Sequence, residues 1–421
     1  MKYNLINRTL IILIFFTFSL YSGLSRVNSP ININILMPAP FAESTSNIIN
    51  QFNLEQKGKI HINLTKGPRE TEAVSDLAIS SLLLGKSPFD IILMDVTWLP
   101  KYAEAGWLEP MNEWFSQDEL SSLSSGARLG NTYKENIYRW PLTADMGLLY
   151  WRTDLMKEAP RTPDELIQIS INLKEKGLVP YGYVWQGHQY EGLSCTFLEI
   201  LKGFGGEWLD DSQNVGLDSE EAIQAANWLR KLIDTGASPK SVANFTENEV
   251  LQAFESGDAA LMRNWPYAWS EVQKDNSPVR GKVGITRMVS KENKEPISTL
   301  GSWGFSVLKD SKNKQAAYKV IKYLTSKESQ KQLLLNSGYT PTNASLYHDK
   351  ELQKKVPILR ELEVALNSTQ PRPQTPLYAQ ISDVLQKHLS SILTENTVVV
   401  KEKMNSATDK TQRILRSAGK T

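Results

Sequence analysis

A short apolar run that ends abruptly in polar and aromatic residues constrains the fold of this chain more than any other sequence feature. Its clearest example lies within Thr246–Trp269. A predicted helix with a capping box at Thr246 and Glu249 precedes the run, and Gly257 ends that helix. The run itself, Ala259–Met262, is typical of a strand buried on both faces of a sheet. The segment therefore predicts an α/β fold in which helix, strand and polar loop follow one another.

Polar and aromatic residues come directly after this run. Arg263, Asn264 and Trp265 follow its last residue, and Pro266 is well placed to begin another helix. In open α/β sheets, ligands bind in the crevice beyond the carboxyl ends of the strands. Trp265 could be a simple core residue, but the polar residues beside it favour the rim of a pocket. A large amphipathic ring with hydrogen-bonding neighbours has the composition of a binding site.

The pattern recurs in two earlier segments. Glu70–Leu84 is amphipathic and predicts a helix, Phe89–Met94 follows as an apolar strand, and Asp95 ends that strand. The third segment, Tyr138–Tyr150, carries Asp145 between two apolar pieces. The chain thus places carboxylates as well as aromatic rings at predicted strand ends.

The N-terminal part of the mature chain alternates strands and helices. Strands are expected at Ile31–Leu36 and Ile60–Leu64, and a helix begins with Thr45–Phe52 between them. Together with the helix and strand that follow, this order is typical of a doubly wound lobe with a mostly parallel sheet.

Length, charge and cysteine content narrow the class of the protein. At 421 residues the chain exceeds a typical single domain, so two are expected. Lys and Arg number 47 against 46 for Asp and Glu, a net charge of +1. No nucleic-acid partner is expected, because that requires clustered positive charge. Cys195 is the only cysteine, so no intrachain disulfide can form, and its helical apolar surroundings predict a buried residue rather than a nucleophile.

The N-terminus has the pattern of a signal peptide over residues 1–25. Lys2 and Arg8 precede the apolar run Leu10–Leu20, which is short for a membrane span but typical of the apolar region of a signal. Small residues at Gly23–Ser25 predict cleavage there, with an uncleaved anchor as the alternative. No cysteine follows the run, so a lipid anchor is not expected. The sequence therefore predicts an exported, periplasmic protein.

Signals for other kinds of chemistry fail. Gly85-Lys86-Ser87 is similar to the end of a phosphate-binding loop, but Ser80 stands where its first glycine belongs. The glycines within 203–206 do not make a dinucleotide fingerprint, and the four histidines are scattered without metal-ligand spacing. No Gly-x-Ser-x-Gly nucleophile elbow is present. Neither a cofactor nor a metal site is expected.

Five motifs of this chain resemble one known family. They are FDIILMDVTW, WPLTADMGLLYW, GYVWQGHQYEGLSC, ALMRNWPYAW and TLGSWGFSV. Together they resemble the extracellular solute-binding proteins of ABC sugar importers, and within these the trehalose/maltose-binding proteins. The resemblance runs from about Ile33 to about Leu385. It implies a monomer that is not an enzyme, binds a sugar as its small-molecule ligand and passes it to the permease subunits of an ABC importer.

The resemblance also implies the type II periplasmic binding protein fold, in which each of two lobes is a mostly parallel sheet flanked by helices. The N-terminal lobe would comprise residues 31–142 and 298–340, and the C-terminal lobe residues 143–297 and 341–421. Proline and glycine near the lobe boundaries suit connectors that change their dihedral angles when lobes move. The chain would cross between the lobes near Pro141–Asp145, Ile297–Trp303 and Tyr339–Asn343.

A sugar-binding cleft between the lobes needs two kinds of side chain. Carboxylates and guanidinium groups pair with the hydroxyls of a sugar, and flat aromatic rings cover its C–H faces. On these grounds and by the resemblance, the expected substrate-binding residues are Glu43, Arg69, Asp95, Asp145, Trp265, Ser302, Trp303 and Arg372. Ser302 is expected to expose its hydroxyl and its backbone amide. Further candidates for lining the cleft are Trp185, Gln186, Tyr190, Glu191 and Tyr267.

Several candidates also have a purely structural interpretation. Asp95 could cap the turn after its strand, and Asp145 could stabilise a hinge turn. The short loop at Glu43 could align one residue off, and the rings around Trp185 could belong to the core. If Asp95 serves only the sugar, its replacement by alanine should weaken binding severely while leaving the melting temperature of the empty protein nearly unchanged.

Two other functions remain open at this point. Asp95 and Asp145 could be the paired carboxylates of a carbohydrate-active enzyme of the glycosidase kind. A sensor subunit could instead bind the sugar and present it to a receptor. The sequence does not identify the sugar, because trehalose, maltose, sucrose and glucosylglycerol all present an α-glucosyl unit.

Overall fold

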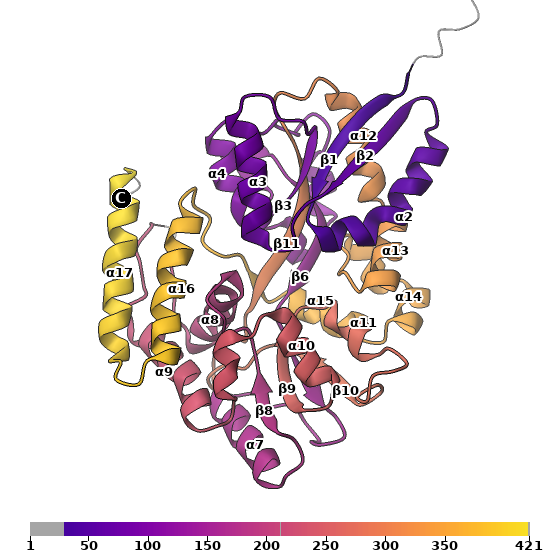
Figure 1. Ribbon diagram of the computed structural model, residues 1–421. Helices are drawn as coiled ribbons and strands as arrows, with labels where there is room; N and C mark the ends of the chain where they lie inside the picture. Colours follow the sequence, from indigo (N-terminus) through magenta and orange to yellow (C-terminus); the bar gives the residue numbers. More distant parts are fainter. Residues whose placement is uncertain (1–28, 211, 420–421) are drawn as a thin grey trace, which may run out of the picture.

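Two β-sheets, one in each of two α/β lobes, organise the protein (Figure 1). The computed structural model describes residues 29–210 and 212–419. The predicted signal peptide lies outside these residues. Among the described residues, no helix has the length and apolar character needed to cross a membrane.

The sheet of the first lobe has six strands, in the order β12-β11-β3-β1-β2 with β6 paired to β11. β1 runs parallel to β2 and β3, whereas β11 is antiparallel to both β3 and β6. The strands are β1 (Ile31–Met37), β2 (Ile60–Lys66), β3 (Ile91–Asp95), β6 (Trp140–Met146), β11 (Ser298–Val307) and β12 (Thr369–Gln370). A separate hairpin consists of β4 (Thr132–Tyr133) and β5 (Asn136–Ile137).

Helices cover both faces of this sheet, which explains why its central strands β3, β6 and β11 are almost wholly buried. Ile33 and Ile35 of β1 pack into one hydrophobic cluster, while Leu36 faces a second cluster with Trp98 and Tyr102 on the other side. The helical segments along this part of the chain are α2 (Ala39–Glu55), α3 (Thr71–Leu83), η1 (Val96–Trp98), α4 (Leu99–Glu104), α5 (Gln117–Ser121), α6 (Ser125–Arg128), α12 (Lys314–Leu324), α13 (Lys327–Ser337), η3 (Ala344–His348), α14 (Lys350–Lys355) and α15 (Leu359–Leu366).

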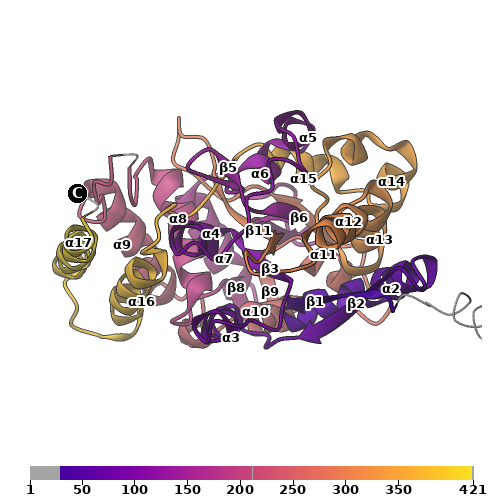
Figure 2. The same ribbon diagram turned by 90° about the horizontal axis from the view of Figure 1, so that it is seen from above.

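The second lobe contains a four-stranded sheet in the order β10-β7-β9-β8. Its strands are β7 (Leu148–Arg152), β8 (Tyr181–Val184), β9 (Ala259–Asn264) and β10 (Val283–Thr286). Its helical segments are α7 (Pro163–Glu175), α8 (Glu191–Phe204), α9 (Glu220–Asp234), η2 (Lys240–Asn244), α10 (Glu247–Glu255), α11 (Ala268–Val272), α16 (Tyr378–Thr394) and α17 (Val400–Ser417). α16 and α17 lie side by side at one edge of the molecule (Figures 1 and 2).

The two-lobe α/β architecture agrees with the sequence prediction, but the sheets are more mixed than expected. In the second lobe β7 is antiparallel to both β9 and β10, and only β8 pairs with β9 in parallel. The path of the chain explains this. β6 continues into β7 and β10 leads into β11, so the antiparallel pair β6–β11 of the first sheet is followed by the antiparallel pair β7–β10 in the second.

Local sequence signals are reproduced closely in the second lobe. The capping box of Thr246 and Glu249 starts α10, and Gly257 follows that helix with φ +89. Thr162 caps α7 through a second capping box, with Pro163 at its first helical position. Cys195 is buried inside α8, as its pattern predicts.

The chain passes directly between the two sheets at β6–β7 and at β10–β11. Gly147 alone separates β6 from β7, and the chain returns from β10 to β11. A Cβ atom at Gly147 would overlap the side chains of Glu199 and Arg263, so only glycine fits there. The residue bounds of the lobes and the crossover positions given above, including the one near Tyr339–Asn343, stay a prediction.

Candidate functional site

β11 is the structural axis of the candidate site. Its register pairs Trp303 with Asp95 of β3 and, on the other side, Gly301 with Asp145 of β6. Because side chains on a strand alternate between faces, Trp303 and Gly301 lie on the same face. Trp303 is also the one residue of β11 that is not buried. Three of the predicted site positions are therefore brought together by one strand.

Asp95, at the carboxyl end of β3, forms hydrogen bonds in two directions. Its Oδ1 accepts from the backbone amide of Thr97 at 2.9 Å and from the Thr97 hydroxyl at 2.7 Å, so it caps η1. Both of its oxygens also accept from Nη2 of Arg372, at 3.0 and 3.1 Å. The structural interpretation of Asp95 is thus confirmed as a contact, and it coexists with a position beside Trp303.

Arg372 connects a carboxylate of each lobe. Its Nη1 donates to Oε1 of Glu191 at 2.7 Å, and Glu191 opens α8 of the second lobe. Glu191 is held in turn by the hydroxyls of Tyr378 and Ser382 on α16. Arg372 is buried, and the Asp95 carboxylate leads the charges that raise its pKa against the effect of desolvation. Its Nε has no hydrogen-bond partner among the described residues.

Trp265 lies just beyond the end of β9, as predicted, and packs against β11. A Cβ atom at Gly301 would be 2.7 Å from Cζ3 of its ring. The Trp265 indole N–H donates to Glu247 at 3.2 Å, and the guanidinium carbon of Arg263 lies 4.1 Å from the ring centroid. Arg263 is itself paired with Glu199, at 2.5 and 3.0 Å. The ring is therefore held at its edge and on one face.

Asp145 is buried at the first crossover. Its Oδ1 accepts from the backbone amide of Thr340 at 3.1 Å, which joins β6 to the segment after α13. Burial raises the pKa of Asp145 to about 6, and the hydrogen bonds from Thr340 oppose this only in part. This contact supports a hinge role for Asp145 at a position directly opposite Gly301.

A second aromatic group extends from Trp303 to the segment after α13. Phe41 of α2 lies between Trp303 and Tyr339, with ring centroids 5.1 and 4.7 Å away. Burial raises the pKa of both Tyr339 and Tyr267; Tyr339 adds to the shift of Tyr267, and the Asp145 carboxylate adds to that of Tyr339. Phe41 is buried and Tyr339 is half-buried, so these rings extend the aromatic packing beside Trp303.

Glu43 and Arg69 lie near Tyr339. Glu43 is ion-paired with Lys66 at 2.5 Å and with Arg69 at 3.5 Å, and all three side chains are solvent-exposed. The hydrogen bond from Lys66 is the main cause of the lowered pKa of Glu43. Both groups also contribute to the electrostatic environment of Tyr339. The two predicted residues therefore neighbour each other and Tyr339.

The arrangement can bind a polar ligand, because charged groups and amphipathic rings from both lobes meet around β11. No group of three or more His, Cys, Asp or Glu side chains in residues 29–210 and 212–419 could hold a metal ion.

The sequence matches the model of the bacterial extracellular solute-binding protein family over residues 38–331. The chain belongs to this family.

Similar proteins support the assignment of the chain to the solute-binding protein family. A probable ABC transporter-binding protein of Deinococcus radiodurans is 32% identical over 349 residues, which cover 80% of this chain and 82% of the relative. A maltotriose-binding protein of Pyrococcus abyssi is 27% identical, over 73% of this chain and 66% of the relative. The solved structure of maltose-bound MalE3 of T. maritima has a TM-score of 0.85 at 31% identity, over 91% of this chain and 100% of that one.

The family assignment decides between the function classes left open by the sequence. Its members bind solutes outside the cell and are not enzymes, so the glycosidase hypothesis is set aside. Asp95 and Asp145 are accordingly carboxylates of a binding protein, and each accepts hydrogen bonds from neighbouring groups.

Two of the candidate residues, Ser302 and Trp185, do not lie where the sequence analysis expects them. Ser302 does not expose its hydroxyl: it lies on the opposite face of β11 from Trp303, fully buried, where it accepts from Arg139 at 2.7 Å and donates to the Thr143 carbonyl. Trp185 belongs to the core, with its indole N–H donating to Ser238 at 3.0 Å.

The other candidates around Trp185 divide between core and site. Gln186 is fully buried and donates to the backbone carbonyl of Arg263 at 3.1 Å. Tyr190 and Glu191, by contrast, point to the site network, Tyr190 through Glu247 and Glu191 through Arg372.

Sequence reasoning missed Glu247, Phe41 and Tyr339. Glu247 follows the capping residue of α10, where an acidic residue needs no further explanation than the helix dipole. Phe41 lies two residues before Glu43 on an apolar helix face and is indistinguishable from a core residue. Tyr339 follows the left-handed Gly338 that ends α13, and this turn is the one local signal that could have marked it.

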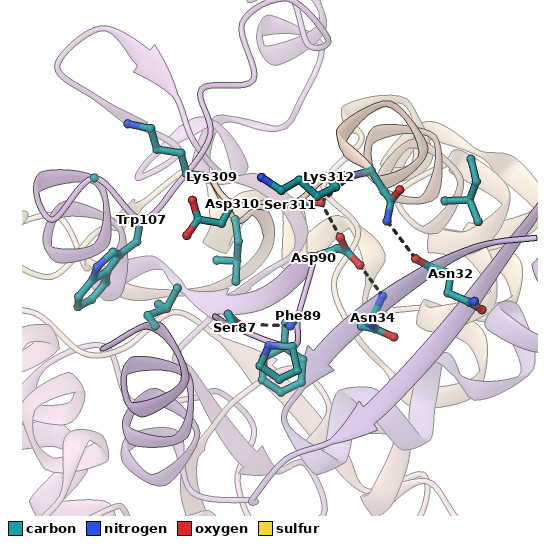
Figure 3. Close-up of a pocket in the computed structure, with 16 residues that line it drawn as sticks. Asn32, Asn34, Ser87, Phe89, Asp90, Trp107, Lys309, Asp310, Ser311 and Lys312 are labelled. Carbon is teal, nitrogen blue, oxygen red and sulfur yellow. Dashed lines mark hydrogen bonds between the residues drawn. The ribbon is translucent and has the colours of Figure 1, made fainter. Parts of the chain in front are cut away.

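The solute-binding protein also has a pocket of about 520 Å³ away from the predicted residues. Figure 3 shows Asp90 in it, accepting from the backbone amide of Asn34 at 3.0 Å and from the Ser311 hydroxyl at 2.5 Å. Asp90 precedes β3, whereas Asp95 ends it, so this pocket lies at the amino end of the strands. None of the predicted site residues lines it.

Proposed function

We propose that this protein binds a sugar with an α-glucosyl unit between its lobes in the periplasm and delivers it to the permease of an ABC importer. The observation that carries the proposal is the meeting of Trp303, Asp95 and Trp265 around β11. Aromatic faces and charged hydrogen-bonding groups at one place are what a sugar ring requires. The expected ligand contacts of these residues follow from this placement and remain part of the proposal.

The relatives support the choice of an α-glucoside among sugars. The solved structure that is 31% identical contains maltose, and one curated relative is a maltotriose-binding protein. Structures bound to tagatose or ribitol are 23% and 21% identical, so they inform the fold alone. The α-glucosyl unit is therefore the part of the proposal that needs direct measurement.

The geometry of Arg372 supports binding by closure of the lobes. In this structure its guanidinium already joins Asp95 of the first lobe to Glu191 of the second. A ligand between the lobes would add contacts to both, and a ligand shifts a conformational equilibrium by its differential affinity for the two states. The closed, loaded form would then be the one that the permease recognises.

Calorimetric titration with a sugar panel tests the ligand. The panel is trehalose, maltose, sucrose and glucosylglycerol, with ribitol and mannitol as controls that lack a glucosyl ring. At least one glucoside should bind and the two polyols should not. Binding of the polyols alone, or of nothing in the panel, would contradict the proposed ligand class.

An uptake assay tests the delivery step. Loss of the gene should abolish accumulation of the labelled sugar that the purified protein binds, and Trp265→Ala should fail to restore it. If uptake persists while a sugar-dependent response is lost, the protein is the sensor subunit considered above.

A further inference from the structure

Glu247, a residue outside the predicted site, contacts two candidate site residues at once. Its Oε1 accepts from the indole N–H of Trp265 at 3.2 Å, and its Oε2 accepts from the hydroxyl of Tyr190 at 2.7 Å. Both oxygens of the carboxylate are thus engaged with protein donors. Hydrogen bonds to an ionised acceptor are stronger and shorter than those between neutral groups.

The position of Glu247 in the fold restricts the movement of its carboxylate. It is the first residue of α10, directly after the capping residue Thr246, so its backbone is fixed by the helix start. Its carbonyl also accepts from the side-chain amide of Asn264 at 3.4 Å, next to Trp265. The helix start and the end of β9 are therefore joined through both the side chain and the backbone of one residue.

Trp265 has few other restraints that fix its rotation. Arg263 lies on one face of the ring, and Gly301 leaves room for the ring against β11. Neither contact is a hydrogen bond with a preferred direction. Each would therefore tolerate a rotation of the indole ring. Glu247 is the group among its described contacts that fixes the indole N–H.

Tyr190 extends this restraint to the neighbouring charged group. It immediately precedes Glu191, which accepts from Arg372 at 2.7 Å, and Arg372 in turn binds Asp95. A carboxylate that holds Trp265 and Tyr190 together therefore links the stacking ring of the second lobe to the ion pairs between the lobes. Burial and the facing Glu247 carboxylate raise the pKa of Tyr190, so its hydroxyl remains a donor.

We infer that Glu247 is a positioning residue that fixes the orientation of Trp265 for stacking on the bound sugar and couples that ring to Tyr190. The inference requires no contact between Glu247 and the ligand, since each of its oxygens already accepts a hydrogen bond from a protein donor. The inference deepens the proposed function and rests on it for the role of the sugar, but the restraint on Trp265 exists without any ligand.

The test begins with the unliganded protein. The indole N–H resonance of Trp265 is assigned by its loss in Trp265→Phe. Glu247→Ala should move or broaden that resonance, because the hydrogen bond to the indole N–H is lost. The matched control is Glu249→Gln on the same helix, whose carboxylate contacts Thr246 and not Trp265, and which should leave the resonance in place.

Sugar affinity provides the functional readout, with the glucoside that the native protein binds. Glu247→Ala should raise its Kd about three- to tenfold, roughly the cost of ordering one freed side chain on binding. Glu247→Gln keeps one acceptor oxygen and should lie between Glu247→Ala and the native protein. Glu249→Gln should keep the native Kd even where it lowers stability through the helix cap.

The two proposals fail separately. An unchanged Trp265 resonance in Glu247→Ala overturns the positioning role, whatever sugar is bound. A native-like Kd for Glu247→Ala with a displaced resonance overturns its importance for stacking. A native protein that binds nothing in the panel overturns the proposed ligand class, while the resonance still decides whether Glu247 holds the ring.

Discussion

Replacement of Asp95 by alanine tests the most connected residue of the site. From the sequence alone, a residue that serves only the ligand should leave the empty protein as stable as before. The structure gives a different expectation, because Asp95 caps η1 through Thr97 and accepts two hydrogen bonds from the buried Arg372. We therefore expect Asp95→Ala to lose both stability and sugar affinity.

The loss of stability can be estimated from these contacts. A lost capping side chain costs about 1 kcal/mol. Removing one partner of a buried ion pair costs about 3–5 kcal/mol when the other charge is left alone. Here Arg372 keeps Glu191 as a partner, so the second contribution is smaller. The sum is about 3 kcal/mol, measured as the free energy of unfolding in urea without sugar.

Asp95→Asn separates the two contributions. The amide keeps an oxygen that can accept from Thr97, but it no longer carries the charge that faces Arg372. It should lose less stability than Asp95→Ala and still bind sugar poorly. If the free energy of unfolding of Asp95→Ala lies within about 0.5 kcal/mol of the native value, the contact with Arg372 does not stabilise the empty protein. The lobes would then stand apart without ligand, and the reasoning from this geometry would be refuted.

Three further substitutions have distinct expected outcomes. Burial raises the pKa of Asp145 from 3.8 to about 6, so its charge destabilises the fold increasingly as pH rises from about 4 to above 6. Asp145→Asn should remove up to about 3 kcal/mol of that penalty, seen as a gain in unfolding free energy at pH 7.5 that vanishes near pH 4, and parallel pH profiles would contradict it. Gly301→Ala would place a Cβ atom 2.7 Å from Cζ3 of Trp265, and calorimetry should find roughly tenfold weaker sugar binding, with native affinity as the contrary result. Ser302→Ala should instead lower the unfolding free energy by about 1–2 kcal/mol through the lost bond to Arg139 and leave affinity unchanged, whereas a large affinity loss would return Ser302 to the site.

Features that depend on neighbouring residues in sequence were predictable. The capping box of Thr246 and Glu249, the apolar core of β9 and the carboxylate at the end of β3 are all local, and each is found where the pattern places it. Asp95 and Trp265 follow from the same local rule, since polar residues after buried strands lie at the ligand-binding edge of a sheet.

Features that depend on contacts between distant segments were not predictable from local patterns. Nothing near Glu247 in sequence indicates that it accepts from Tyr190, 57 residues earlier, or that Arg372 lies between Asp95 and Glu191. The mistake at Ser302 was avoidable, however. Adjacent residues of a strand face opposite sides, so Ser302 and Trp303 could not both face the same ligand.

The placement of the site on β11 has a mechanical consequence. The strand begins at a crossover, where Ser298 donates to the Gly147 carbonyl at 2.7 Å and the Thr299 amide donates to Glu199 at 3.2 Å. Glu199 also holds Arg263, the residue beneath the Trp265 ring. The start of β11 and the support of the Trp265 ring therefore share one buried carboxylate. Because a close-packed interior transmits small displacements, a movement of Trp265 would reach the start of β11 through Arg263 and Glu199.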